Sequence, residues 1–513
     1  MKILFADGDG ARMPQPFRFA KPAVFLLSVA SLQVVHAALR PVLTPTVGTD
    51  DVDQIFFAQY LAAGYSYEIP PLYTWIMWLV TQLLGPTVLA IGIVKYGVVF
   101  AIHLFTYFGA RRVICDPRLQ VIAGLSPMTL YPIGWRLHEA DTYGVLSAAC
   151  MMALVWAVLA VIQDRRLSRY LALGLALGAG LLSSGYFVIG ALALLLALPF
   201  LAEGRRALAH WNFLSALAVA TLLVLPWALW IVDQDQAFWD RALSVMTGNG
   251  VDLPAWWVRL WKLVESLVLA GFPFWVIFPT IFLHTLRPLP TAERGWVGRL
   301  LWSYGALMVV GFAALVYLGP IASLNAFRVY PSVLPLVLLF FWRADRFGVQ
   351  QRRARWAWLV FAMLVVVVIQ ARFQQIEAGP AFCKVCRMQA PYTDVANWLR
   401  HEGFNGRGTI VAGDNYVAGN ARVNFPKARV VTPRYGEVVP PVDSMEGACV
   451  IVWPEDMRRN DFDRLMQYLE DANINLPSME QIPLLTFDVQ NTPRITMPKR
   501  TMQFRIYLSP TKC

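Results

Sequence analysis

Three carboxylates within four residues, Asp50, Asp51 and Asp53, begin a segment that is otherwise aromatic and apolar. The pattern predicts a short helix with its carboxylates at the N-terminal end, where the helix dipole favours negative charge. The segment is too short to cross a membrane, and its aromatic residues favour a helix lying in the membrane interface. A carboxylate at that depth can serve as a general base on a lipid-anchored substrate. Helix capping is the alternative explanation.

Two further clusters place ionisable groups beside apolar runs. Residues 136–141 (Arg-Leu-His-Glu-Ala-Asp) fill a very short turn between two such runs. Charge next to hydrocarbon is unfavourable and indicates a functional site, although an ordinary hydrated loop is the alternative. Lys95 lies near the middle of an apolar run, where pairing with a carboxylate or a phosphate is favoured over snorkelling.

Arg328 and Tyr330 lie two residues apart at the entrance of another apolar run. The forked donors of arginine suit a phosphate, and tyrosine adds a further donor. The alternative is an aromatic anchor with a charged neighbour, which is common at the ends of membrane spans.

The composition around these clusters is that of an integral membrane protein. Of the 513 residues, 57% are hydrophobic and 15% are charged, and the mean hydropathy is +0.50. Soluble domains have about half apolar and a quarter charged residues, so a soluble enzyme is excluded. The net charge of +11 comes from small clusters rather than from one basic patch, so no nucleic-acid partner is expected.

About eleven apolar runs predict transmembrane helices, because each is near the ~20 residues that cross a bilayer. The first is interpreted as a retained span rather than a signal peptide, and two short runs around Ser183 as a hairpin. Arginine-rich connections alternate with acidic ones, which places the N-terminus in the cytoplasm and the acidic loops outside. The runs are about 22–39, 88–108, 119–135, 142–163, 170–185, 186–202, 212–232, 258–283, 300–318, 328–342 and 356–376.

The composition changes after Ile376, so we divide the chain into a membrane module, 1–376, and an external domain, 377–513. Short strand-like runs alternate with helical ones in the second part, which predicts a small α/β domain. In an oxidising compartment, Cys383 and Cys386 are expected to form a local disulfide rather than half of a zinc site. Since no cluster has metal-ligand spacing, no metal or other cofactor is expected.

Together these clusters resemble the lipid-linked-sugar glycosyltransferases of the GT-C fold, families 39 and 83. Within these families the chain resembles the bacterial lipid A aminoarabinose transferases and, more distantly, the protein O-mannosyltransferases. The opening motif of these enzymes is an acidic pair, then Gly-Tyr, then a Pro-Pro-Leu turn. The matching positions are Asp50-Asp51, Gly64-Tyr65, 70–75, Lys95, Asp141, 174–183, Arg328-Val329-Tyr330-Pro331 and 413–420.

The resemblance implies a polytopic helical protein of the bacterial inner membrane that acts on the periplasmic face. Its donor would be a sugar on undecaprenyl or a similar polyprenyl phosphate, and its acceptor an envelope lipid or glycan: lipopolysaccharide, a hopanoid or a polysaccharide. Asp50 would be the general base of an inverting transfer, with Asp51 as the second catalytic carboxylate. The residues expected to bind the substrates are Glu68, Lys95, Asp141, Arg328 and Tyr330.

Two positions depart from the family pattern. Asp51 stands where many relatives have Glu, and Ile69 replaces the Lys of the aminoarabinose enzymes. One group that contacts phosphate or sugar is therefore missing, so aminoarabinose is not the expected sugar.

Two other functional classes were weighed. A transporter or flippase of a lipid-linked sugar predicts charged residues deep in several spans and pseudo-symmetric halves. The charge here is concentrated in the outer loops, which favours the enzyme. A non-catalytic assembly or sensor protein would have no need of the three carboxylates.

Overall fold

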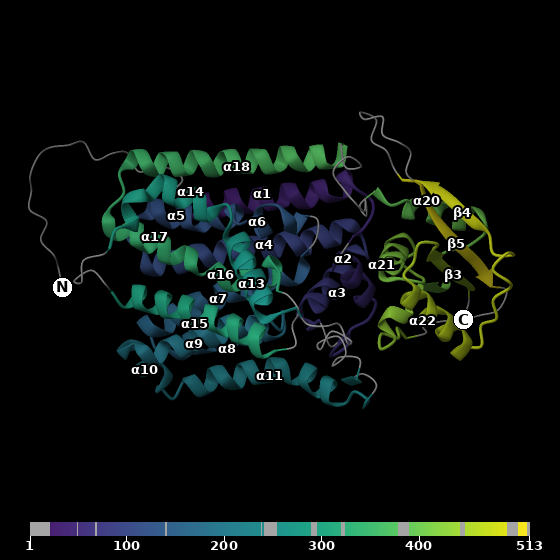
Figure 1. Cartoon of the computed structure of the whole chain (residues 1–513), viewed down its shortest axis with the longest axis horizontal. Coiled ribbons are helices and arrows are strands. Elements are labelled where there is room, and N and C mark those ends of the chain that lie inside the picture. Colours follow the sequence, from purple (N-terminus) through teal and green to yellow (C-terminus); the bar gives the residue numbers. More distant parts are fainter. Residues whose placement is uncertain are drawn as a thin grey trace, which may run out of the picture.

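The computed structural model describes residues 21–48, 50–66, 69–138, 141–236, 239–240, 254–288, 295–319, 324–377, 389–441, 447–489 and 501–509. Helices run along the long axis of the molecule as a bundle, and a five-stranded sheet lies beyond one end of it (Figure 1).

Six spans among the described residues are long and apolar enough to cross a membrane. A seventh results if the bent pair Phe187–Phe200 and Ala202–Leu208 counts as one. The chain is therefore a multi-pass membrane protein, and the total of about eleven spans stays a prediction. The six are α1 (Pro22–Leu43), α4 (Val88–Val113), α7 (Thr142–Gln163), α11 (Phe213–Val232), α15 (Trp296–Leu318) and α16 with α17 (Ala326–Val333, Leu336–Phe347).

Two of the expected spans are interrupted. The run 119–135 forms α5 (Pro117–Leu125), a 3-10 turn (Ser126–Thr129) and α6 (Tyr131–Gly134). The run 258–283 divides into α13 (Trp256–Gly271) and α14 (Phe274–Phe282). Proline accounts for these breaks, because Pro127, Pro132 and Pro273 lack the N–H that a continuous helix needs. The last run is a single helix, α18 (Gln351–Glu377).

The glycine-rich run 174–183 serves helix packing. It lies in α8 (Leu167–Leu181), where Gly174 and Gly178 face α11. A Cβ on Gly174 would overlap the backbone of Ala216, and one on Gly178 would lie 2.9 Å from the Leu223 side chain. Small residues spaced by four let two membrane helices approach closely.

The C-terminal sheet has the strand order β2-β1-β3-β5-β4. Strand β1 runs parallel to β2 and β3, whereas β5 is antiparallel to β3 and β4. The division of the chain at residue 376 stays a prediction. The elements are α20 (Tyr392–His401), β1 (Gly408–Ala412), α21 (Asn415–Asn424), β2 (Arg429–Val431), β3 (Ala448–Pro454), α22 (Arg459–Asp471), β4 (Leu484–Asp488) and β5 (Thr501–Ser509).

The cysteines of this part are only partly described. Cys383 and Cys386 lie outside the described residues, so their predicted disulfide stays a prediction. Cys449 on β3 is disulfide-bonded, and its partner also lies outside the described residues.

The arginine-rich connections meet at the end of the bundle opposite the sheet. Arg112 donates to Gln163 (2.8 Å), Asn212 donates to the Arg165 carbonyl (3.2 Å), and Arg343 donates to the Arg287 carbonyl (2.8 Å). The alternation of charge along the sequence thus becomes a separation of charge between the two ends.

Candidate active site

The three N-terminal carboxylates lie on α2 (Asp50–Phe57), which occupies the space between the bundle and the sheet (Figure 1). Every residue of this helix after Asp50 is buried. Gln54 anchors it on two sides, because its amide accepts from Thr74 Oγ1 (2.8 Å) and donates to Tyr143 Oη (3.0 Å). Thr74 lies on α3 (Leu72–Leu84) and Tyr143 on α7.

Asp50 is bound at the N-terminus of α7. Its Oδ2 accepts hydrogen bonds from the backbone N–H groups of Asp141 (3.0 Å) and Thr142 (3.1 Å), where a helix favours an anion. Burial raises the pKa of Asp50, the Thr142 N–H opposes this rise, and the charge of Asp51 adds to it. Among the described residues, Oδ1 has no hydrogen-bond partner. Within the described part of the chain, one oxygen is therefore fixed and the other is free to accept a proton.

Asp51 forms a buried ion pair with Lys95. Its Oδ2 lies 2.7 Å from Nζ, and each side chain is only 2% exposed. Thr142 Oγ1 donates to the other carboxylate oxygen at 3.0 Å. Of the two partners considered from the sequence, a carboxylate and a phosphate, the structure has the carboxylate.

Asp141 and Tyr330 lie next to each other and close to Asp50. Asp141 adopts a left-handed backbone conformation, φ 74°, and its Oδ1 caps α7 by accepting from the Gly144 N–H at 3.0 Å. Burial raises the pKa of Asp141 to about 7; the charge of Asp50 adds to the rise, and the nearby Tyr330 hydroxyl opposes it.

Several buried oxygens at the site lack a partner among the described residues. They are Asp141 Oδ2, Tyr330 Oη and Tyr73 Oη. The Tyr330 hydroxyl lies beside the Asp141 carboxylate but does not form a hydrogen bond of ordinary geometry with it. The Tyr73 hydroxyl lies close enough to Asp50 and Asp51 to interact electrostatically with both carboxylates. Buried polar atoms are nearly always paired, so this set suits a polar ligand.

Arg328 is exposed at the start of α16, two residues before the buried Tyr330. Its guanidinium group lies over the Tyr186 ring at 5.1 Å, and that of Arg136 lies over Phe327 at 5.5 Å. Two cationic groups therefore accompany the start of this helix.

The structure brings together Asp50, Asp51, Lys95, Asp141 and Tyr330, as the family motifs imply. It does not describe Glu68. Arg259 of α13 donates to the Gly319 carbonyl at 3.1 Å. The roles of the individual residues remain predictions.

Sequence reasoning missed several residues. Thr142 has no signal in the sequence, since its role depends on α7 starting beside Asp50. Asn415 of the C-terminal part donates to Asp53 Oδ1 at 2.7 Å. Burial raises the pKa of Asp53 to about 7, and the Asn415 hydrogen bond opposes this rise.

An apolar groove of about 560 Å³ lies among α3, α4, α7 and α8. Its lining on α7 runs from Leu146 to Trp156, which is about 15 Å along the helix. Gly97 on α4 faces open space, because a Cβ there would meet nothing within 4 Å. The groove thus begins one turn beyond the helix end that binds Asp50.

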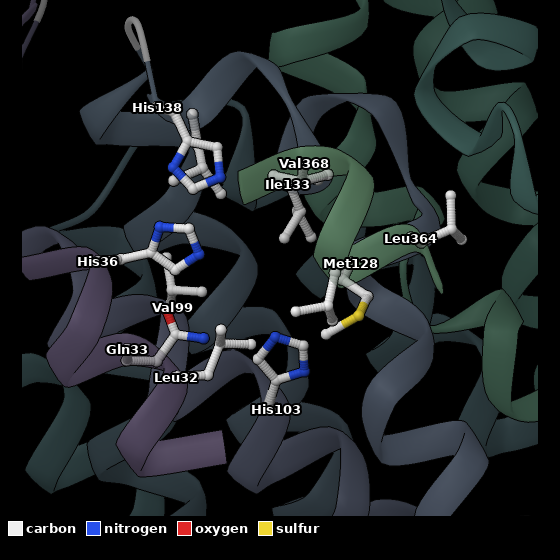
Figure 2. A pocket seen from close by; sticks show the side chains of 13 residues that line it. Leu32, Gln33, His36, Val99, His103, Met128, Ile133, His138, Leu364 and Val368 are labelled. Carbon is white, nitrogen blue, oxygen red and sulfur yellow. The ribbon is translucent and has the colours of Figure 1, made fainter. Parts of the chain in front are cut away.

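A second cavity contains three histidines, His36, His103 and His138 (Figure 2). His138 Nδ1 hydrogen bonds with Tyr96 Oη (2.9 Å), and His103 Nδ1 with the Gly124 carbonyl (2.8 Å). His103 is therefore a packed, hydrogen-bonded histidine. Within the described part of the chain, no group of three or more His, Cys, Asp or Glu residues is suited to hold a metal ion.

Comparisons with known proteins find relatives that are all named as glycosyltransferases. Residues 68–230 match the family model for dolichyl-phosphate-mannose-protein mannosyltransferase. The lipopolysaccharide core galacturonosyltransferase RgtA of Rhizobium johnstonii is 27% identical over 435 residues, which is 83% of this chain and 86% of that protein. An undecaprenyl phosphate-alpha-4-amino-4-deoxy-L-arabinose arabinosyl transferase of Pseudomonas fluorescens is 28% identical over 282 residues, 50% of this chain and 48% of that one.

The fold is shared with ArnT from Cupriavidus metallidurans, whose crystal structure has undecaprenyl phosphate bound. The TM-score is 0.56 at 14% sequence identity, and the match covers 94% of this chain and 98% of that one. The match in fold therefore extends over nearly the whole of both chains.

Proposed function

Because the chain is a glycosyltransferase of the GT-C fold, related to the aminoarabinose and protein mannosyltransferases, we propose that it transfers a hexuronic acid from undecaprenyl phosphate to lipopolysaccharide. The hexuronic acid is favoured because the match to a galacturonosyltransferase covers 83% of the chain, and the match to an arabinosyl transferase 50%. Ile69, in place of the Lys of the aminoarabinose enzymes, points the same way.

The observation that carries the proposal is the state of Asp50. Its Oδ2 is fixed by two amides of α7, and its Oδ1 has no hydrogen-bond partner among the described residues. Asp141 Oδ2 and Tyr330 Oη, which lie near Asp50, also lack a partner in that part of the chain. In the proposed reaction, Oδ1 takes the proton of an acceptor hydroxyl while the hydroxyl oxygen bonds to the anomeric carbon. The bond from that carbon to the phosphate oxygen breaks, and undecaprenyl phosphate leaves with the electron pair. Such base catalysis contributes roughly 10²- to 10⁴-fold.

Tyr330 and Arg328 are proposed to bind the leaving phosphate. The buried hydroxyl of Tyr330 has no partner among the described residues, and the exposed Arg328 lies on the same helix. Donors that are already in place stabilise charge as it develops on a leaving group. Lys95 is not available for this role while it neutralises Asp51.

The apolar groove supports a second lipid-anchored substrate. Met151 of α7 lies near Ser332 of α16, and the groove residues Ala149 and Ala153 lie about half a turn away on α7. A donor bound at α16 would therefore leave the groove free, and the groove suits an acyl chain of the acceptor.

The C-terminal part is proposed to lie in the periplasm. Its Cys449 is disulfide-bonded, and disulfides persist in oxidising compartments. Cys115 is a free, exposed cysteine in the arginine-rich connection at the opposite end.

The test gives the purified protein, in detergent, undecaprenyl-phosphate galacturonate and lipopolysaccharide that lacks this sugar. We expect free undecaprenyl phosphate and lipopolysaccharide heavier by one hexuronate, in equal amounts. A flippase would release no free carrier, so its absence alongside an active reference enzyme would contradict the proposal.

A further inference from the structure

Residues 44–48, which follow α1, have no regular secondary structure, and side chains hold their backbone. From the membrane side, the buried Arg40 donates to the carbonyl oxygens of Thr46 (3.2 Å) and Thr44 (3.4 Å). This segment leads directly to Asp50, so whatever fixes it also fixes the start of α2.

Asn420 of the C-terminal part holds the same segment from the other side. Its Oδ1 accepts from the Val47 N–H, and its Nδ2 donates to the Val47 carbonyl, both at 2.9 Å. Nδ2 also donates to the carbonyl of Tyr416 in its own helix at 2.9 Å. Asn420 is 1% exposed, so none of these bonds is shared with solvent.

The close approach of α21 to α2 depends on a glycine. A Cβ on Gly419 would lie 2.6 Å from the Cα of Val52, one residue after Asp51. The two helices lie side by side in Figure 1. Asn420 is therefore placed against the carboxylate end of α2.

The same interface contains a second amide with the same bonding pattern. Gln59 Nε2 donates to the Val430 carbonyl (3.0 Å), and the Val430 N–H donates to Gln59 Oε1 (2.9 Å). Gln59 lies nine residues after Asp50, whereas Val47 lies three residues before it. Two side-chain amides, Asn420 and Gln59, therefore bind a backbone N–H and carbonyl across this interface, and we call each a clamp. The two clamps lie at different distances along the sequence from Asp50, the proposed base.

We propose that Asn420 is a positioning residue of the transfer reaction. By holding Val47 it fixes the N-terminal end of α2, and with it the distance from Asp50 to the α7 amides. The C-terminal part would thereby complete the active site rather than only cover it. The inference rests on the proposed role of Asp50 as the base.

The physical reason is that the Val47 N–H and carbonyl are buried. Without Asn420 both would lose their partners, and a buried unpaired group is unfavourable enough to shift the segment. A misplacement of about 1 Å at a reacting group lowers a rate by roughly 10²-fold.

The experiment compares Asn420→Ala with Gln59→Ala, which loses the same pair of bonds across the same interface. Turnover is measured with the full chain, undecaprenyl-phosphate galacturonate and lipopolysaccharide. We expect Asn420→Ala to lower kcat by about 10- to 100-fold with KM changed less than about threefold. Gln59→Ala should keep kcat within about twofold of the unchanged protein. Equal losses in the two variants would overturn the inference, because only domain docking would then matter.

The pH dependence of kcat distinguishes positioning of Asp50 from a merely structural role, because a structural role would leave the pH profile unchanged. If α2 shifts, Asp50 loses its α7 amide bonds, which favour the ionised form. The acidic limb of kcat should therefore move to higher pH in Asn420→Ala and stay in place in Gln59→Ala. An unmoved limb in Asn420→Ala would count against positioning.

Hydrogen–deuterium exchange decides the point without any substrate. Amides of residues 44–57 should exchange faster in Asn420→Ala than in Gln59→Ala, and unchanged exchange in Asn420→Ala would overturn the inference. Failure of the unchanged protein to turn over this donor would remove the proposed sugar, and the exchange result would still stand.

Discussion

At the scale of single residues, the carboxylates of the site differ in their partners: Lys95 pairs with Asp51, and backbone amides of α7 bind Asp50. The sequence identified Lys95 as a mid-span cation that needs a partner, and Asp51 as half of an acidic pair. It could not join them, because 44 residues separate the two and only the folded chain brings Asp51 of α2 and Lys95 of α4 to 2.7 Å. The same limit applies to Asp50, whose partners are backbone amides of α7.

Replacement of Lys95 by Met should destabilise the protein strongly, since Asp51 would become an unpaired buried charge. We expect a loss of about 3–5 kcal/mol in the free energy of unfolding. Replacement of Asp51 by Asn in the same chain should recover most of this loss. Thermal unfolding in detergent measures both. A stable Lys95→Met variant that binds donor weakly would indicate a phosphate contact instead.

Asp53 should make stability depend on pH. Its pKa is about 7 in the folded protein against an ordinary 3.8, so between these values the folded state keeps a proton that the unfolded chain loses. Stability should therefore fall as pH rises through this window and level off above about 7. Asp141 contributes with the same sign.

The corresponding experiment is a thermal midpoint at pH 5 and at pH 8. The midpoint should be higher at pH 5, and Asp53→Asn should reduce the difference. Asp463→Asn, at an exposed position of α22, is the control and should leave it unchanged. An undiminished difference in Asp53→Asn would show that Asp53 does not carry a raised pKa.

At the scale of the elements, α7 organises the site. Its N-terminus binds Asp50, and one of its faces lines the apolar groove. Most spans could be predicted from apolar runs, because burial in a bilayer demands them. The breaks in the runs 119–135 and 258–283 were missed, since mean hydropathy does not register the missing N–H of Pro132 or Pro273.

Gly97→Leu should fill the groove without disturbing the helix, since a Cβ there meets nothing within 4 Å. We expect a rise of roughly tenfold in KM for the lipid acceptor, which is the scale of one or two lost apolar contacts. Leu214→Phe adds bulk on the exposed face of α11 and should leave KM unchanged. Unchanged KM in Gly97→Leu as well would show that no substrate chain occupies the groove.

At the scale of the whole molecule, the C-terminal part and the first outer loop share one core. Phe56, Phe57 and Tyr65 belong to the same buried cluster as Val417 and Val430. The α/β character of the C-terminal part could be predicted from its alternating runs. Its contact with α2 could not, because side-chain clamps such as Asn420 leave no periodic signal in the sequence.

The orientation of the whole molecule is testable at Cys115, which is exposed and free. If the arginine-rich end is cytoplasmic, a membrane-impermeant maleimide should not label Cys115 in intact cells and should label it after permeabilisation. Cys115→Ala supplies the background. Labelling in intact cells would reverse the proposed orientation and place Asp50 on the cytoplasmic side.

The most direct test of the account is Asp50→Asn in a deletion strain, followed by mass analysis of lipopolysaccharide at matched protein abundance. The amide can still accept from the α7 N–H groups but cannot take a proton. We therefore expect the transferred sugar to fall by roughly 10²- to 10⁴-fold. Asp116→Asn, at the opposite end of the molecule, should leave the product unchanged. A normal product profile in the Asp50→Asn strain would contradict the assignment of the base and, with it, the proposed mechanism.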